Sequence, residues 1–181
     1  MRPATSPLLA LAGFHLRPIE PADAPAWHAY LALPRVVEHT SWNVAGPHDL
    51  APIIAWCNEA NPASAIRFAV IDAVQDRLAG TIGFHTIVPA HGTAELAYDF
   101  HPDYWGRGLA SDCCEAIVHW GVAQRGFVRV QATVLDTNAR SIALLERRAF
   151  QREGLLRSYR RVRGQPRDFF MYSRLAGPGP A

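Results

Sequence analysis

Apolar and polar residues alternate with a period of two in several segments, a pattern typical of half-buried strands. The clearest are residues 94–100, AELAYDF, and 127–135, FVRVQATVL. Similar patterns, with Gly, Pro and Asp around them, predict further strands at 14–19, 65–74, 78–88, 149–153 and 167–175. Residues 75–77 are predicted to join two of these strands in a hairpin.

Apolar residues recur at helical spacing between these strands. The pattern predicts a long helix from Leu109 onward and shorter helices at 21–33, 47–60 and 137–148, while residues 34–43 are predicted to be irregular. This order of elements predicts a mixed sheet covered by helices, an α/β or α+β fold. We expect a single domain over residues 1–175 and a flexible tail at 176–181, since no repeat or linker divides the chain.

A glycine turn separates the strand at 94–100 from the long helix. His101-Pro102-Asp103 ends the strand, and Trp105, Gly106, Arg107, Gly108, Leu109, Ala110 and Ser111 lead into the helix. Glycines allow close approach to the backbone, and a helix start attracts anions, so the turn could hold a phosphate or pyrophosphate. It matches neither the P-loop nor the dinucleotide fingerprint, and an ordinary turn remains the alternative.

Composition narrows the class of protein. The chain has 181 residues, 49% hydrophobic and 19% charged, as in soluble globular proteins, and its apolar runs are too short to cross a membrane. Cys57, Cys113 and Cys114 suggest no disulfide framework, so we expect a reducing cytoplasm. No spacing among the histidines predicts a metal site.

The net charge of +2 is unevenly distributed. Ten arginines between residues 140 and 174 face three acids, a local balance of +7, while 8 arginines against 13 acids leave −5 elsewhere. Such a region could bind a phosphorylated ligand or nucleic acid, or could be a solvated surface. Nucleic acid is not the expected partner, because no RNA-binding or zinc-finger motif accompanies the arginines.

Two motifs together resemble a known family. The turn YWGRGLA, preceded by Glu95 and Tyr98, and the later Asn138-Ala139-Arg140-Ser141 are similar to motifs of the GNAT superfamily of N-acetyltransferases. The branch of bacterial ribosomal-protein N-terminal (alanine) acetyltransferases is the most similar. The resemblance covers residues 14–175. It implies a central, mostly antiparallel seven-stranded sheet whose splayed central strands form a coenzyme A cleft.

The resemblance implies acetyl coenzyme A as the cosubstrate and no metal. Its pyrophosphate would lie on the glycine turn, and its pantetheine arm would follow the strand ending at Phe100 and His101, near Asn138 and Ser141. Asn138 could instead cap a helix, and Ser141 could be an ordinary helical serine. The family's usual Arg or Gln at the first position of the turn is Trp105 here.

The implied reaction is attack of a neutral amine on a thioester. Glu95 is the first candidate for the base, although it could be a surface carboxylate. A backbone N–H near Phe100 or His101 would stabilise the oxyanion. The family's usual Tyr donor is replaced by Leu145, which leaves Ser141 as the candidate acid. On the same analogy, acceptor contacts are expected from His39, Trp42, His85 and Asp99.

These features predict an N-acetyltransferase acting on a protein N-terminus or a small amine, as a monomer or homodimer without a membrane partner. Two alternatives remain: a catalytically silent coenzyme A-binding module, and a ribosome- or RNA-associated protein that uses the arginine-rich region.

Overall fold

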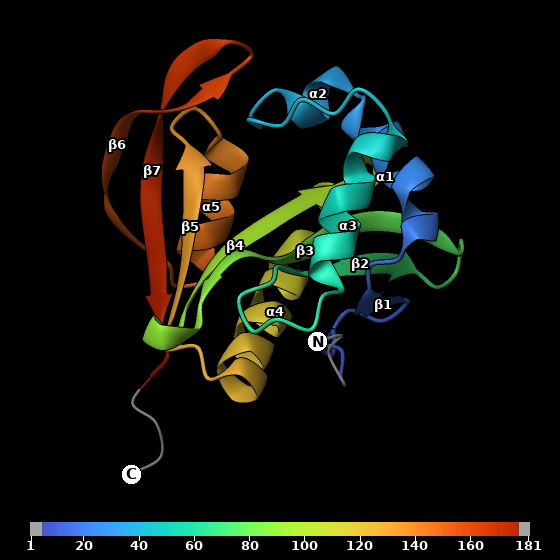
Figure 1. Cartoon of the computed structure of the whole chain (residues 1–181), viewed down its shortest axis with the longest axis horizontal. Coiled ribbons are helices and arrows are strands. Elements are labelled where there is room, and N and C mark those ends of the chain that lie inside the picture. The colour runs from blue at the N-terminus through green and yellow to red at the C-terminus, as the bar shows by residue number, and fades with distance from the viewer. Residues whose placement is uncertain (1–4, 178–181) are drawn as a thin grey trace.

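In a computed structural model, which describes residues 5–177, the fold is built on one seven-stranded sheet (Figure 1). The spatial order is β1 (Phe14–Pro18), β2 (Ile66–Asp72), β3 (Arg77–Val88), β4 (Thr93–Phe100), β5 (Arg129–Leu135), β7 (Gln165–Leu175) and β6 (Gln151–Val162). All neighbouring strands are antiparallel except β4 and β5. The predicted fold class is confirmed.

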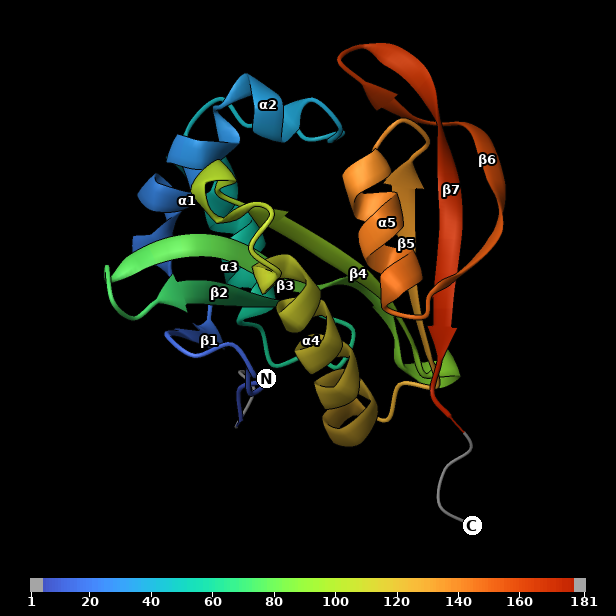
Figure 2. The ribbon, with the colours of Figure 1, turned by 180° about the vertical axis from the view of Figure 1, so that it is seen from behind.

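Helices cover both faces of the sheet. On one face lie α1 (Ala24–Leu31), α2 (Pro34–Val37) and α3 (Ala51–Cys57). The other face carries α4 (Leu109–Arg125) and α5 (Ala139–Arg147), which face the viewer in Figure 2. Short 3-10 turns occupy Pro21–Asp23, Pro47–Leu50, Pro89–His91 and Pro102–Tyr104.

Each face of the sheet has its own hydrophobic core. Every residue of β2 is buried, and successive residues point to opposite sides. Phe68 and Val70 pack in the larger cluster with α4, whereas Ala69 and Ile71 pack in a second cluster with α1 and α3. The sheet therefore separates two hydrophobic cores, and a cleft that connects its two faces must run between strands.

The sheet opens between β4 and β5. These strands pair only where Thr93–Glu95 lie beside Arg129–Gln131, and then they diverge (Figure 1). Each strand stays paired with its other neighbour, because β4 pairs with β3 from residue 93 to 100 and β5 pairs with β7 from residue 129 to 135. The result is a V-shaped gap between two firmly built halves.

Several predicted boundaries need correction. β6 runs to Val162 instead of ending near residue 153, and register shifts after Arg152 and Leu156 interrupt its alternation and so hid it in the sequence. The segment at 34–43 contains α2, and the helices expected at 21–33 and 47–60 are shorter and start with 3-10 turns. Of the expected tail at 176–181, residues 178–181 lie outside the described chain.

Candidate active site

The glycine turn ends in an uncapped helix start. Gly106 and Gly108 have φ of 75° and 81°, a region that favours glycine, and an added β-carbon would meet no atom of residues 5–177 within 4 Å at either. Gly108 is the N-cap of α4, and no described side chain caps that end. The first N–H groups of this 17-residue helix therefore face an open surface and favour an anion.

Cations and an indole surround this turn. Trp105 donates its Nε1–H to the carbonyl of Phe100 over 2.9 Å, which ties the turn to the end of β4. The guanidinium of Arg140, from the start of α5, lies 4.7 Å from the Trp105 ring. Arg107 lies over Tyr104 at 5.8 Å. The sequence predicted a role for Arg107 but not for Arg140, which belongs to the motif Asn138-Ala139-Arg140-Ser141.

The Ser111 side chain has a partner within the protein. Arg148 donates its Nε–H to Ser111 Oγ over 2.7 Å, and Arg148 also lies 3.8 Å from Glu115. Ser111 Oγ accepts this bond, so both its own O–H and the backbone N–H of Ser111 can still donate to an anion at the helix start.

The backbone edge of β4 next to the gap can be deduced from its ladder. The N–H of His101 donates to Ala79 on β3 over 2.9 Å, so it is not available as an oxyanion donor, which corrects that expectation. Ladder bonds alternate along an antiparallel strand, so the N–H groups of Tyr98 and Phe100 point the other way, toward the gap. Phe100 is the remaining candidate of the two predicted donors.

The His101 side chain is also engaged within the fold. Its Nδ1 accepts from the Asp103 N–H over 3.1 Å, and its Nε2 lies 3.2 Å from Arg77. The ring packs edge-on against Tyr30 and Tyr104. These contacts give the His101 side chain a structural role at the end of β4, and the predicted role of this residue in cofactor binding stays a prediction.

A cleft of about 480 Å³ runs through the gap in the sheet. On the α5 side it is lined by Asn138 and Ser141. Asn138 Oδ1 accepts from the Ser141 N–H over 3.2 Å, so the helix-cap alternative holds for this oxygen, while its amide nitrogen remains for a ligand. The predicted residues His39, Trp42 and His85 line the opposite part of the cleft.

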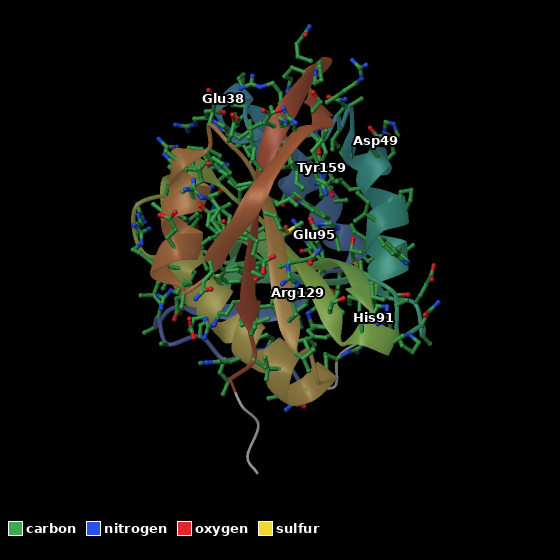
Figure 3. The ribbon with its side chains drawn as sticks, turned by 90° about the vertical axis from the view of Figure 1, so that its left-hand side faces the viewer. Glu38, Asp49, His91, Glu95, Arg129 and Tyr159 are labelled. Atoms are coloured by element: carbon green, nitrogen blue, oxygen red, sulfur yellow. The ribbon has the colours of Figure 1, made fainter. Side chains whose placement is uncertain are left out.

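Glu95 lies in the interior, between the levels of Tyr159 and Arg129 in Figure 3. Its side chain is 7% exposed, and its Oε1 accepts from Thr133 over 2.7 Å and lies 3.4 Å from Arg160. Burial raises the pKa of Glu95, but hydrogen bonds from His85 and Thr133 and the charges of His85 and Arg160 outweigh burial and bring it down to about 2. So low a pKa favours the ionised carboxylate and makes Glu95 a weak proton acceptor, and its assignment as the base stays a prediction.

A β-bulge brings His85 to Glu95. The register of β3 against β4 shifts between Phe84 and Thr86, so His85 is the extra residue, and such bulges redirect side chains. Its Nε2 lies 3.3 Å from Glu95 Oε1, and its Nδ1 lies 2.8 Å from Thr86 Oγ1. The imidazole is half-buried and lines the cleft. Because Glu95 itself does not line the cleft, His85 is the group of this pair that a ligand can reach.

Asp99 lies beneath the cleft in a closed network. Its two oxygens accept from Trp27 Nε1 over 3.0 Å, from Tyr30 and Thr81, and form an ion pair with buried Arg67. The guanidinium of Arg67 lies 5.3 Å from Trp27 and 5.6 Å from Trp42. Asp99 thus has four partners within the fold and does not line the cleft, and its predicted contact with the acceptor stays a prediction.

Tyr98 was missed as a site residue. It lines the cleft on the α5 side, and its buried hydroxyl has no hydrogen-bond partner among residues 5–177. Burial raises the pKa of Tyr98, while an interaction with the Ser141 side chain, too weak in geometry to count as a full hydrogen bond, lowers it in part. Leu145, at the position of the family's usual Tyr, is fully buried in the core. The clue in the sequence was Tyr98 itself, three residues after Glu95 on the opposite face of the strand.

Residues 5–177 contain neither a membrane-spanning helix nor a cluster of metal ligands. Within residues 5–177, no helix is long and apolar enough to cross a membrane. The same residues contain no group of three or more His, Cys, Asp or Glu side chains that could hold a metal ion.

The chain is similar in sequence to known proteins. A family described as an acetyltransferase (GNAT) domain matches residues 14–151. An uncharacterized N-acetyltransferase, p20 of Bacillus licheniformis, is 33% identical over 165 residues, 88% of this chain and 91% of its own length. A ribosomal-protein-serine acetyltransferase of Escherichia coli is 30% identical over 104 residues, 56% of each chain.

The fold also matches solved structures. A spermidine N-acetyltransferase from Vibrio cholerae, in complex with coenzyme A and spermine, superimposes with a TM-score of 0.81 at 20% sequence identity, covering 91% of this chain and 96% of its own. At this identity the match supports the fold alone. Together with the family match over residues 14–151, it leads to one conclusion: the chain belongs to the GNAT acetyltransferase family.

Proposed function

We propose that the protein transfers an acetyl group from acetyl coenzyme A to a primary amine, on a protein N-terminus or a small molecule. The observation that carries this proposal is the gap between β4 and β5, which opens a cleft from the α4–α5 face to the Glu95–His85 pair. The names of relatives support it, because one acts on a ribosomal-protein serine and a structural neighbour on spermidine.

Acetyl coenzyme A, which supplies the acyl group as a thioester, fits the α5 side of the cleft together with the glycine turn beside α5. The turn itself does not line the cleft, and we call the two parts together the cofactor half. The uncapped start of α4 and the cations Arg107 and Arg140 suit a pyrophosphate. The free edge of β4 suits an arm that pairs like an added strand. The proposed binding residues are Phe100, Trp105, Gly106, Arg107, Gly108, Leu109, Ala110, Ser111, Asn138 and Ser141, with Arg140 added.

In the second half, we assign proton removal from the amine to His85. An amine of pKa about 8 to 10 must lose a proton before it attacks a carbonyl carbon. His85 lines the cleft and directs Nε2 at Glu95, whose lowered pKa favours the carboxylate. With Nε2–H donated to Glu95, Nδ1 is the nitrogen that takes the amine proton, and it exchanges its contact with Thr86 Oγ1 for the amine; the carboxylate orients the ring and stabilises the imidazolium that forms. Glu95 is then a positioning residue.

Two hydroxyl groups could assist the departing sulfur. Ser141 and Tyr98 both line the α5 side of the cleft, and the Tyr98 hydroxyl lacks an internal partner. We assign Tyr98 as the donor that the leaving thiolate needs, with Ser141 beside it. The N–H of Phe100 is the proposed donor to the carbonyl oxygen as it gains negative charge.

The test is a thiol-release assay with acetyl coenzyme A and a panel of amines, run with calorimetric titration of the cofactor. We expect saturable cofactor binding and amine-dependent thiol release. Binding without release from any amine would favour the silent binding module, and absence of binding at millimolar cofactor would contradict the proposed function.

We also infer a reducing cytoplasmic location, because Cys57, Cys113 and Cys114 are all free and buried. The arginine-rich region has internal partners in this fold: Arg174 pairs with Glu115, Arg160 with Glu95, and Arg163 with the loop at 37–43. We therefore propose no nucleic-acid partner. A monomer or homodimer is expected, which sedimentation analysis would test.

A further inference from the structure

The acceptor half of the cleft has an unusual lining for an enzyme that handles amines. Its apolar wall consists of Trp42, Ile53, Trp56, Cys57 and Phe169. Among the described residues that line the whole cleft there is no Asp or Glu. A polar acceptor with several positive charges would find neither counter-ions nor hydrogen-bonding groups along this wall.

Two acids beside the cleft, Asp99 and Glu95, already have cationic partners. Asp99 pairs with Arg67, and Glu95 pairs with Arg160 and faces His85. Glu38 is 66% exposed on its side chain and lies 4.0 Å from His39. The acidic cleft that a polycation would require is therefore not formed by these side chains.

Cations border the same space. Arg67 lies on the floor beneath Trp42, and Arg160 lies 4.9 Å from the Tyr159 ring. Arg163, at the turn between β6 and β7, donates to the carbonyls of Val37 over 2.8 Å and Trp42 over 3.1 Å. This arginine fixes the loop at 37–43 next to the cleft. Arg67 and Arg160 are balanced by Asp99 and Glu95, whereas the oxygens to which Arg163 donates are uncharged, so a second ammonium group on the acceptor would meet a positive charge at this end of the cleft.

We infer that the acceptor is a primary amine bearing an aromatic or bulky apolar group and no second positive charge. This inference rests on the proposed acetyl transfer and adds the acceptor class. The apolar group would pack on Trp42, Trp56 and Phe169 while the amine reaches His85. A small aromatic amine and a peptide with an aromatic first residue share this chemistry.

The experiment compares acceptors with wild-type protein at saturating acetyl coenzyme A. The panel contains phenethylamine, spermidine, ethanolamine, and two tripeptides that begin with Phe or Ala. We expect kcat/KM for phenethylamine or the Phe peptide to exceed that for spermidine at least about tenfold, since one hydrophobic group typically discriminates 10- to 200-fold. Whichever of the two is preferred identifies the source. Calorimetric titration of phenethylamine and spermidine into the protein gives a readout independent of turnover.

A matched pair of variants tests the lining. Trp56→Glu places a carboxylate on the wall at a position already 42% exposed, and Val74→Glu makes the same kind of change at a position 86% exposed, outside the residues lining the cleft. Trp56→Glu should lower kcat/KM for phenethylamine at least about tenfold and narrow or reverse the preference over spermidine. Val74→Glu should leave both values unchanged.

The outcomes separate the two proposals. Spermidine used as well as phenethylamine by the wild type would overturn the acceptor class while leaving acetyl transfer intact. Thiol release with none of the amines, despite cofactor binding, would instead overturn the proposed function. Unchanged selectivity in a folded Trp56→Glu protein would overturn the role of the apolar wall.

Discussion

The two halves of the cleft are built in different ways. The cofactor half uses short pieces of chain: one glycine turn, one helix start and one cap, within residues 105–111 and 138–141. The acceptor half joins side chains from α1, α3, β3, β4, the loop at 37–43 and the β6–β7 hairpin. The first half consists of backbone donors that any sequence with these glycines would present, while the second depends on the identity of distant side chains. One half can therefore stay constant while the other changes its acceptor.

The largest expected effect comes from a substitution in the acceptor half that lowers activity without changing cofactor affinity. Replacing His85 by Gln removes the proposed proton acceptor and should lower kcat/KM about 100- to 1000-fold, as loss of general-base catalysis typically does. The affinity for acetyl coenzyme A, measured by calorimetry, should not change. His15→Gln, at an exposed position on β1, is the matched control. Activity retained by His85→Gln would remove this histidine from the mechanism.

The next largest effect comes from a substitution in the cofactor half that lowers the affinity for acetyl coenzyme A. Valine at position 108 disfavours a φ of 81°, so Gly108→Val should displace the first N–H groups of α4. Loss of two hydrogen bonds to a charged group corresponds to a dissociation constant about 100-fold higher. Gly154→Val is the control, because Gly154 also has open space but no positive φ. Equal affinity in both variants, by calorimetry, would argue against a pyrophosphate at this turn.

A pH experiment sharpens the account of Glu95. Its pKa is lowered from 4.5 to about 2 by folding, so its stabilising contribution is present above pH 4.5 and is lost as pH falls toward 2. Between pH 7 and pH 3, the wild type should lose about 2 kcal/mol more of its free energy of unfolding than Glu95→Gln. Urea unfolding at several pH values measures this difference. Parallel pH curves for the two proteins would show that Glu95 is not held ionised by its partners.

The smallest effect concerns Tyr98. Tyr98→Phe removes a hydroxyl that interacts at most weakly with Ser141, so the free energy of unfolding should fall by less than about 1 kcal/mol, while kcat/KM should drop about tenfold if one hydrogen bond to the leaving group is lost. Tyr159→Phe, on the β6–β7 hairpin, is the control. Unchanged activity in Tyr98→Phe, or a loss of stability that accounts for the lower activity, would contradict the assignment.

The cofactor half was predictable because its signals are local. Gly106 and Gly108 must be glycines for their φ angles, and Asn138 stands three residues before Ser141, so neighbouring positions carry the geometry. The seven-stranded sheet followed from the resemblance, although the length of β6 was missed because bulges interrupt its alternation. The sequence did not show whether the N–H of Phe100 or of His101 faces the gap. The hydrogen bonds between β3 and β4 do show it, since His101 donates its N–H to the carbonyl of Ala79.

The acceptor half was not predictable at the same level. His39, Trp42 and His85, which were predicted to contact the acceptor, all line the cleft, but the bulge that turns His85 toward Glu95 has no signature in the sequence. The pKa of Glu95 depends on Thr133 and Arg160, which lie 38 and 65 residues away. The ion pair of Asp99 with Arg67 could not be predicted, because Arg67 comes from another strand.

Amide hydrogen exchange with and without acetyl coenzyme A tests the division between the halves most directly. The account predicts slower exchange in peptides covering residues 106–112 and 138–142 and at the open edge of β4. Exchange in the loop at 37–43 and in α3 should be unchanged until an amine is added. Protection confined to the loop and α3, or no protection near residue 108 at saturating cofactor, would contradict the account.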